Sequence, residues 1–173
     1  MKSRATIGGH PIHPILVTVP IGLFLWTFVA DVVYVLRDHE APWYDIAFWS
    51  GIAAVVSGAT AALFGLIDGL TVAWQSDARE KAIAHGSLNT AVMALYLAAI
   101  IMMMDNGAVE GRDLGIVVAL HAAGVGLLLL SGWLGGEMVF RHHLGVIPED
   151  AEAEQEQKER HAAPRGVPHA RSR

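Results

Sequence analysis

Histidines lie near the ends of the long apolar segments of this chain, where their side chains could bind a metal ion or a haem. Five of the nine histidines are placed in this way, namely His10, His13, His85, His142 and His143. Neutral imidazole is a good ligand for zinc, copper, non-haem iron and haem iron. These imidazoles, with the carboxylates nearest to them, are therefore the residues whose chemistry has to be explained first.

The first two histidines stand in a stiff segment, Gly-His-Pro-Ile-His-Pro at positions 9–14. Each proline fixes its own φ and favours an extended conformation for the histidine before it. Pro14 suits the first position of a helix, because its missing N–H costs no hydrogen bond there. The pattern predicts a rigid helix entrance that carries two imidazoles, those of His10 and His13.

Three polar side chains lie within about two helical turns of the histidine level, and they are Asp68, Asn89 and Glu137. Such groups orient a ligating imidazole by hydrogen bonding to its other ring nitrogen, and they can also carry protons. Asn89 follows His85 by four residues and therefore shares its helix face. Glu137 and Arg141 are also four residues apart, so a simple ion pair at the membrane edge is an equal alternative for them.

A second polar pair is expected further along the same helices. Asp31 follows His13 by 18 residues, or five full helical turns, so both side chains point the same way. His121 lies about two turns into the last apolar segment, at a depth similar to that of Asp31. We expect the two to meet in a structural hydrogen bond. A second ligand site, a proton path and an axial haem ligand at His121 are the alternatives.

Four apolar runs are long enough to cross a bilayer, whose core of about 30 Å needs roughly 20 helical residues. We expect helices at about residues 14–36, 46–74, 82–104 and 113–140. The chain is 53% hydrophobic and 17% charged, with a mean hydropathy of +0.41, which is too apolar for an ordinary soluble domain. The sequence therefore predicts an all-α integral membrane four-helix bundle over residues 1–147.

The distribution of cationic residues predicts the orientation of this bundle in the membrane. One side carries Lys2, Arg4, Arg79, Lys81 and Arg141. The other side has only Arg37 and Arg112, in loops that are rich in acidic residues. Because cationic residues near the ends of spans favour the cytoplasmic side, both termini, the middle loop and the histidine level are predicted to face the cytoplasm.

Small residues at helical spacing predict close packing of antiparallel helices. The second run contains Gly58, Ala62, Gly65 and Gly69, and the fourth contains Gly132 and Gly136. Faces of this kind let backbones approach closely, either within one chain or in a homo-oligomer. Pro20 predicts a local bend in the first helix.

The two halves of the chain show a weak internal repeat. His85 follows His13 by 72 residues, and Glu137 follows Asp68 by 69 residues. Each histidine lies near the start of an odd-numbered span, and each carboxylate lies near the end of the span after it. A duplicated helical hairpin with its axis along the membrane normal would produce this pattern, and so would chance.

The composition excludes several kinds of site and partner. Because the chain has no cysteine, disulfides, thiolate metal sites, cysteine-ligated iron–sulfur clusters and c-type haem attachment are excluded. The chain carries a net charge of −5, and residues 148–173 form an acidic and then basic cytoplasmic tail that we expect to be largely disordered. No concentrated basic patch exists, so nucleic acid is not an expected partner.

Six short motifs together carry a resemblance to one known family. They are Gly-His-Pro-Ile-His-Pro at 9–14, Pro-Ile-Gly at 20–22, His-Gly-Ser-Leu-Asn at 85–89, Ser-Gly-Trp-Leu-Gly-Gly-Glu at 131–137, Arg-His at 141–142 and Gly-Val at 145–146. In this combination, over about residues 8–147, the chain resembles the bacterial four-helix membrane family catalogued as domain of unknown function 2231. The resemblance implies a multi-pass protein of the bacterial inner membrane without an established activity. Some relatives are joined to Rieske-type iron–sulfur domains, which implies electron transfer. Since this chain has no cysteine, such a redox partner would be a separate iron–sulfur protein. His143 stands where relatives carry glycine.

Our leading hypothesis is a membrane redox protein that passes electrons near the cytoplasmic face. The expected cofactor ligands are drawn from His10, His13, His85 and His142. A b-type haem needs two axial imidazoles, whereas non-haem iron, copper or zinc would use three or four of these histidines with a carboxylate. The iron–sulfur association favours haem. The rival hypothesis is a non-enzymatic membrane module, transporter-like or an assembly subunit, whose polar residues form a structural cluster.

Overall fold

The structure is a computed structural model that describes residues 5–8, 10–70, 72, 76–106 and 111–142. Within these ranges β1 (Thr6–Ile7) and β2 (His10–Pro11) pair in an antiparallel ribbon. The helices are α1 (Ile12–Leu16), α2 (Thr18–Leu36), α3 (Ala41–Gly69), α4 (Asp77–Asn106) and α5 (Gly111–His142). The predicted tail at 148–173 and His143 lie outside the described residues.

Four helical spans are long and apolar enough to cross a membrane, counting α1 and α2 together. The second expected helix, at 46–74, begins earlier than expected and is found at Ala41–Gly69, while residues 71 and 73–75 of its expected end lie outside the described residues. Hydropathy placed this boundary wrongly because the first turn carries polar and amphipathic aromatic side chains that lower the mean hydropathy. Pro42, in the first turn of α3, marks the true start, as its missing N–H permits.

The first span is interrupted at Val17, which separates α1 from α2. Pro20 has no N–H to donate to the carbonyl of Leu16, four residues earlier. The Thr18 hydroxyl instead donates to the carbonyl of Ile15 at 2.9 Å, and the helix resumes with Ile21 N–H donating to Val17 at 3.2 Å. Val17 itself keeps right-handed helical angles, with φ at −64° and ψ at −20°, so the bend expected from Pro20 stays a prediction.

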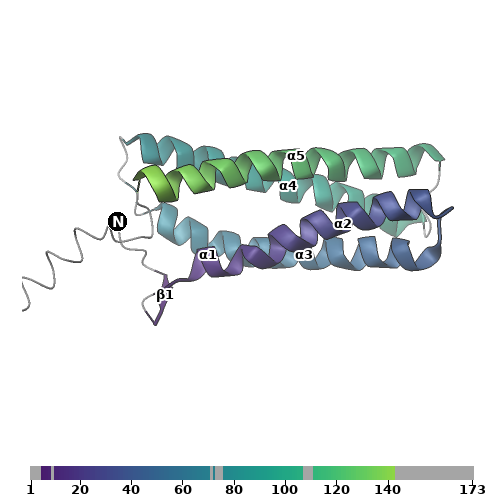
Figure 1. Cartoon of the computed structure of the whole chain (residues 1–173), viewed down its shortest axis with the longest axis horizontal. Helices are drawn as coiled ribbons and strands as arrows, with labels where there is room; N and C mark the ends of the chain where they lie inside the picture. Colours follow the sequence, from purple (N-terminus) through teal and green to yellow (C-terminus); the bar gives the residue numbers. More distant parts are fainter. Residues whose placement is uncertain (1–4, 9, 71, 73–75, 107–110, 143–173) are drawn as a thin grey trace, which may run out of the picture.

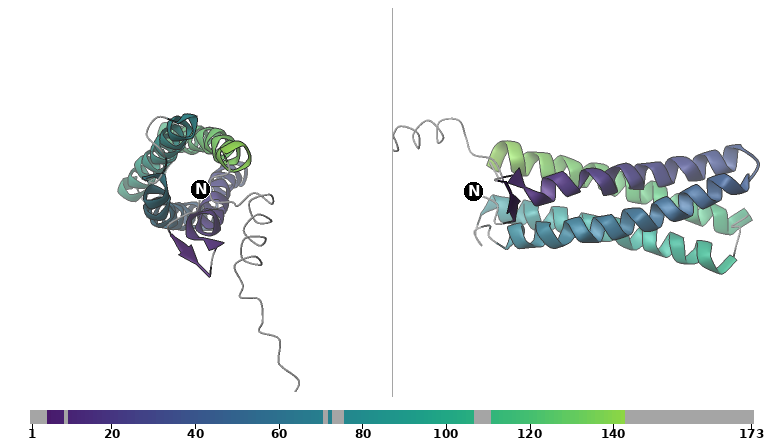
Figure 2. Two further views of the ribbon diagram at one scale, coloured as in Figure 1. Left: turned by 90° about the vertical axis from the view of Figure 1, so that its left-hand side faces the viewer. Right: turned by 90° about the horizontal axis from the view of Figure 1, so that it is seen from below.

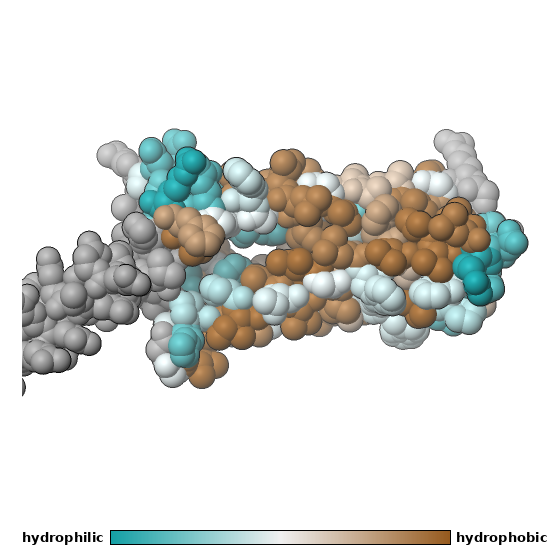
Figure 3. Space-filling model, viewed as in Figure 1, coloured by the Kyte–Doolittle hydropathy of each residue, from teal (hydrophilic) through white to brown (hydrophobic). Residues whose placement is uncertain are grey.

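The long helices lie side by side along one axis and form a closed ring when seen from the end (Figures 1 and 2). We call α1, α2 and α3 the first half and α4 and α5 the second half. The helices of each half pack closely along one another, and the contacts between the halves are sparser. Outward-facing side chains along the middle are mostly hydrophobic, and hydrophilic ones lie at the two ends (Figure 3). A bundle that is apolar on its outer surface is suited to lipid.

Two hydrophobic clusters fill the interior at different depths. The first comprises Ala30, Tyr34, Ala47, Ala99, Met103, Leu114 and Val117. The second comprises Phe24, Ala54, Val92, Tyr96 and Leu128. In the second cluster Tyr96 packs against Phe24 with ring centres 4.5 Å apart, and its hydroxyl donates to the Phe24 carbonyl at 2.7 Å. This bond ties the two halves together inside the bundle.

Candidate functional site

His13 is held inside the first half by a neighbouring helix. Its Nδ1 lies 2.9 Å from the carbonyl oxygen of Ala61 on α3. Because a carbonyl only accepts, Nδ1 carries the proton and Nε2 carries the free lone pair. The ring lies against Gly65, where an added Cβ would come within 2.8 Å of it. Gly65 is therefore needed to seat the imidazole.

His85 is held in the second half in the same manner. Its Nδ1 lies 2.9 Å from the carbonyl oxygen of Ser131 on α5 and 2.9 Å from the Ser131 hydroxyl. The ring lies against Gly135, whose added Cβ would be 3.2 Å away. The Asn89 side-chain amide donates to Nε2 at 3.0 Å, as the four-residue spacing predicts. Nε2 of His85 is therefore also an acceptor.

The two imidazoles face each other across the bundle. Their ring centres are 6.5 Å apart and their planes are at 88°. We call His13 and His85 the imidazole layer. Both rings are partly exposed, and both donate the Nδ1–H to a backbone carbonyl. Imidazoles held in this way are fixed in tautomer and orientation, as metal-ligating histidines usually are.

The halves repeat the contacts of a histidine with one carbonyl and one glycine. The two sets are His13, Ala61 and Gly65, and His85, Ser131 and Gly135. Their members are separated by 72, 70 and 70 residues. Phe24 and Tyr96, which contact each other, are also 72 residues apart. These matched contacts support a duplicated hairpin as the origin of the repeat.

The other two histidines proposed as ligands lie at the ends of the described elements. His10 is exposed on β2, and His142 is the last residue of α5. Across the described parts of the chain, no group of three or more His, Cys, Asp or Glu side chains is arranged to hold a metal ion. The described side chains therefore give no support to a four-histidine cluster, and ligation by His10 and His142 stays a prediction.

The carboxylates near this level are engaged in structural contacts. Asp68 accepts a hydrogen bond from the backbone N–H of Ala5 at 3.3 Å. Glu137 pairs with Lys81 at 2.5 Å and with Arg141 at 2.8 Å. The ion pair with Arg141 follows the four-residue spacing, whereas the partner from α4 had no signal in the sequence. Each carboxylate holds the segment that begins its own half of the bundle.

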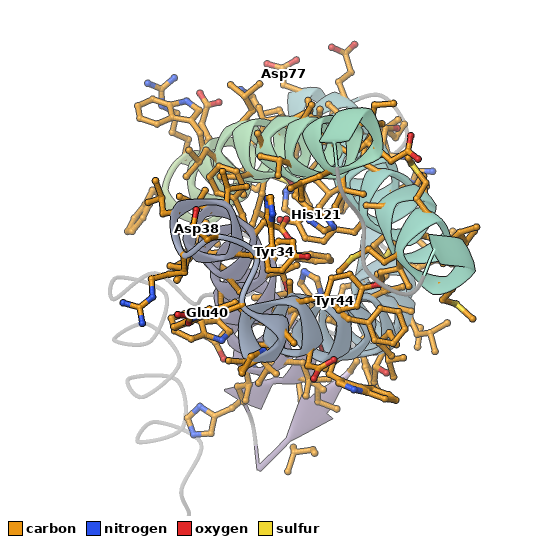
Figure 4. The ribbon with its side chains drawn as sticks, turned by 90° about the vertical axis from the view of Figure 1, so that its right-hand side faces the viewer. Tyr34, Asp38, Glu40, Tyr44, Asp77 and His121 are labelled. Carbon is orange, nitrogen blue, oxygen red and sulfur yellow. The ribbon has the colours of Figure 1, made fainter. Side chains whose placement is uncertain are left out.

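Asp31 and His121 meet in the interior, as their depths predict. Nδ1 of His121 is hydrogen-bonded to Oδ2 of Asp31, and the two side chains are 0% and 3% exposed. We call this pair the carboxylate layer. Seen along the bundle, His121, Tyr34 and Tyr44 project into the space between the helices (Figure 4). The Tyr96 ring covers the imidazole with centres 4.3 Å apart.

Sequence reasoning missed the groups that complete the imidazole layer. The carbonyls of Ala61 and Ser131 have no signal in a sequence, because every residue has a carbonyl. Gly65 could be identified only as a small packing residue, although it also seats an imidazole.

Comparison with known proteins gives one match. The family model described as "Predicted membrane protein (DUF2231)" matches residues 9–148, which confirms the resemblance seen in the motifs. No curated protein and no solved structure matches the chain. The match adds membrane location but assigns no reaction.

Proposed function

We propose, from the premise that this chain belongs to the DUF2231 family of predicted membrane proteins, that it is an electron-transfer protein holding a b-type haem between His13 and His85. The observation that carries the proposal is the facing pair of imidazoles, each presented by a different half of the bundle. Haem iron takes two axial imidazoles, and the interior of a helical bundle is a usual place for such a group.

The spacing of the two rings supports this assignment. A metal–imidazole nitrogen bond is about 2 Å, so two imidazoles on opposite sides of one iron have centres roughly 6 Å apart. The observed separation is 6.5 Å. In both rings Nδ1 is hydrogen-bonded to a carbonyl, so Nε2 is the nitrogen that could bind the iron. Nε2 of His85 presently accepts from Asn89, so an iron would compete with that amide.

The number of imidazoles favours haem over a single metal ion. Zinc, copper and non-haem iron sites use three or four protein ligands, whereas two imidazoles meet here. Haem would supply one-electron chemistry. The protein would supply two ligands of fixed orientation, on helices that Gly65 and Gly135 allow to approach closely.

The proposal includes a placement in the cell. Successive spans run antiparallel in the bacterial inner membrane, with both termini and the imidazole layer on the cytoplasmic side. The lysine and arginine bias of the loops supports this orientation. The electron partner is a separate protein, of which an iron–sulfur protein is the type we favour.

Absorption spectroscopy of the purified, gently extracted protein tests the haem. We expect a Soret band in the wild type, a stoichiometric haem content, and loss of haem in His13→Ala and His85→Ala. His10→Ala is the matched control, because His10 is exposed in the same segment, and it should keep its haem. A wild-type protein that stays colourless after incubation with haemin contradicts the proposal.

One observation favours a second candidate, a non-enzymatic membrane module. Each histidine of the imidazole layer already fastens its helix to a neighbour through a carbonyl, which is a structural task in itself. For such a module we expect a colourless protein without stoichiometric metal by elemental analysis. A colourless protein with one equivalent of zinc, copper or iron would indicate a non-haem site.

A further inference from the structure

The carboxylate layer is the only charged group deep in the spans, and the proposed haem site makes no use of it. Four stretches of the helices contain no Asp, Glu, Lys, Arg or His other than Asp31 and His121, and they are residues 18–36, 46–67, 88–104 and 114–136. Ionisable residues inside a membrane are costly and usually functional. Asp31 and His121 therefore need an account of their own.

The pair is buried inside the bundle. Asp31 lies three residues before Tyr34 of the first hydrophobic cluster and seven after Phe24 of the second, and His121 is fully buried. The Tyr96 ring on α4 stacks on His121, and Tyr34 on α2 and Tyr44 on α3 project into the same space between the helices (Figure 4). Phenols do not supply a positive charge. Of these described side chains, His121 is therefore the one that can balance the carboxylate.

Charge balance then fixes how many protons the pair holds. A carboxylate next to a neutral imidazole leaves one negative charge in a low-dielectric interior, which is expensive. One further proton makes the pair neutral. The neutral pair then holds two protons. One is shared between Nδ1 of His121 and the Asp31 carboxylate, and the other is on Nε2, wherever the shared proton lies.

The position of Nε2 agrees with this assignment. Among the residues that the structure describes, no group forms a hydrogen bond with this buried nitrogen. The hydroxyl of Tyr96, whose ring covers the imidazole, is committed to the Phe24 carbonyl. A proton on Nε2 is therefore held by charge and not by a second hydrogen bond, so it remains free for transfer.

We propose that Asp31 and His121 form a proton-binding site in the membrane interior, in which Nε2 of His121 takes one proton from water and can pass it to an incoming acceptor. The new bond is Nε2–H, the proton donor is a hydronium ion that leaves as water, and the net charge of the pair changes from −1 to zero. The site goes beyond the proposed haem function and does not require it.

Nuclear magnetic resonance of the full-length protein, labelled with ¹⁵N-histidine in lipid nanodiscs at neutral pH, tests the proposal. We expect a directly bonded proton on Nε2 of His121, and none on Nε2 of His13 and His85. The latter two are internal controls, since their N–H groups face carbonyls. His121 is recognised by the contact of its ring with the Tyr96 ring, whose centre is 4.3 Å away, and His121→Gln confirms the assignment where that variant folds.

Nε2 of His85 is expected to carry no proton. A wild-type spectrum in which Nε2 of His121 also carries no proton overturns the proposal. The measurement is made on the unsubstituted protein, so it does not depend on a variant that folds. It also gives an answer whether or not haem is bound. Failure of the haem proposal and failure of the proton site are therefore separate outcomes.

Discussion

The imidazole layer and the carboxylate layer use the same residue type in different surroundings. In the imidazole layer each histidine is partly exposed and bonds to a carbonyl within its own half of the bundle. In the carboxylate layer His121 is fully buried and bonds to Asp31 across the two halves. A carbonyl partner fixes a proton on Nδ1 of the imidazole and leaves Nε2 available to a metal, whereas a buried carboxylate partner requires a balancing positive charge.

The difference also separates the mechanical roles of the two layers. Bonds that join the halves lie in or near the interior clusters, from Asp31 to His121, from Tyr96 to Phe24 and from Tyr44 to Met103. At the imidazole layer the hydrogen bonds of His13 and His85 stay within one half. The halves are therefore tied at the carboxylate layer, and at the imidazole layer they face each other through their rings.

The largest effect on stability is expected from removing one partner of the Asp31–His121 pair. His121→Leu leaves Asp31 without its partner, which should cost about 3–5 kcal/mol of unfolding free energy. Unfolding in a graded series of detergent mixtures measures this quantity. The double variant Asp31→Leu/His121→Leu should recover most of the loss, because it removes the buried charge. Equal stability of the single and double variants would show that no buried charge is at stake.

A smaller effect is expected from crowding the imidazole layer. In Gly65→Ala the new methyl group would meet the His13 ring at 2.8 Å, and overpacking of this kind costs about 1–3 kcal/mol. Gly69→Ala, one turn later in the same helix, meets nothing within 4 Å and is the matched control. We also expect Gly65→Ala to bind less haem than the control. Equal haem content and equal stability in both variants would contradict the seating of His13 on α3.

A still smaller loss is expected from the tie between the halves at Tyr96. Tyr96→Phe removes the hydroxyl that donates to the Phe24 carbonyl and leaves the ring stack on His121 in place. We expect a loss of about 1 kcal/mol in unfolding free energy. The haem content should stay unchanged, since the imidazole layer keeps its bonds. A change in haem content without a change in stability would mean that the layers are coupled through this tyrosine.

The smallest effect is expected at the edge of the bundle. Arg141 is 75% exposed in its pair with Glu137, whereas Lys81 is 27% exposed. Removal of Arg141 leaves Glu137 paired with Lys81, so Arg141→Ala should not change stability measurably. Lys81→Ala should be the more harmful of the two, since it removes the less exposed ion pair between α4 and α5. The reverse order in a thermal unfolding assay would mean that the exposed pair carries the contact.

The parts of this molecule that follow from spacing could be predicted from the sequence, and the parts that follow from the backbone could not. The four spans and the meeting of Asp31 with His121 depend on hydropathy and helical rise, which the residues display directly. The seats of His13 and His85 depend on carbonyls and on glycine in a neighbouring helix. The exposed position of His10 depends on a short ribbon that hydropathy does not describe.

The electron paramagnetic resonance spectrum of the oxidised, haem-loaded protein tests the central claim most directly. Two imidazoles on one haem iron with planes at 88° should give a low-spin signal of high anisotropy, as near-perpendicular axial rings do. The signal should be lost in His13→Ala and in His85→Ala, and retained in His10→Ala. A high-spin signal, or a protein that takes up no haem, would contradict axial ligation by His13 and His85.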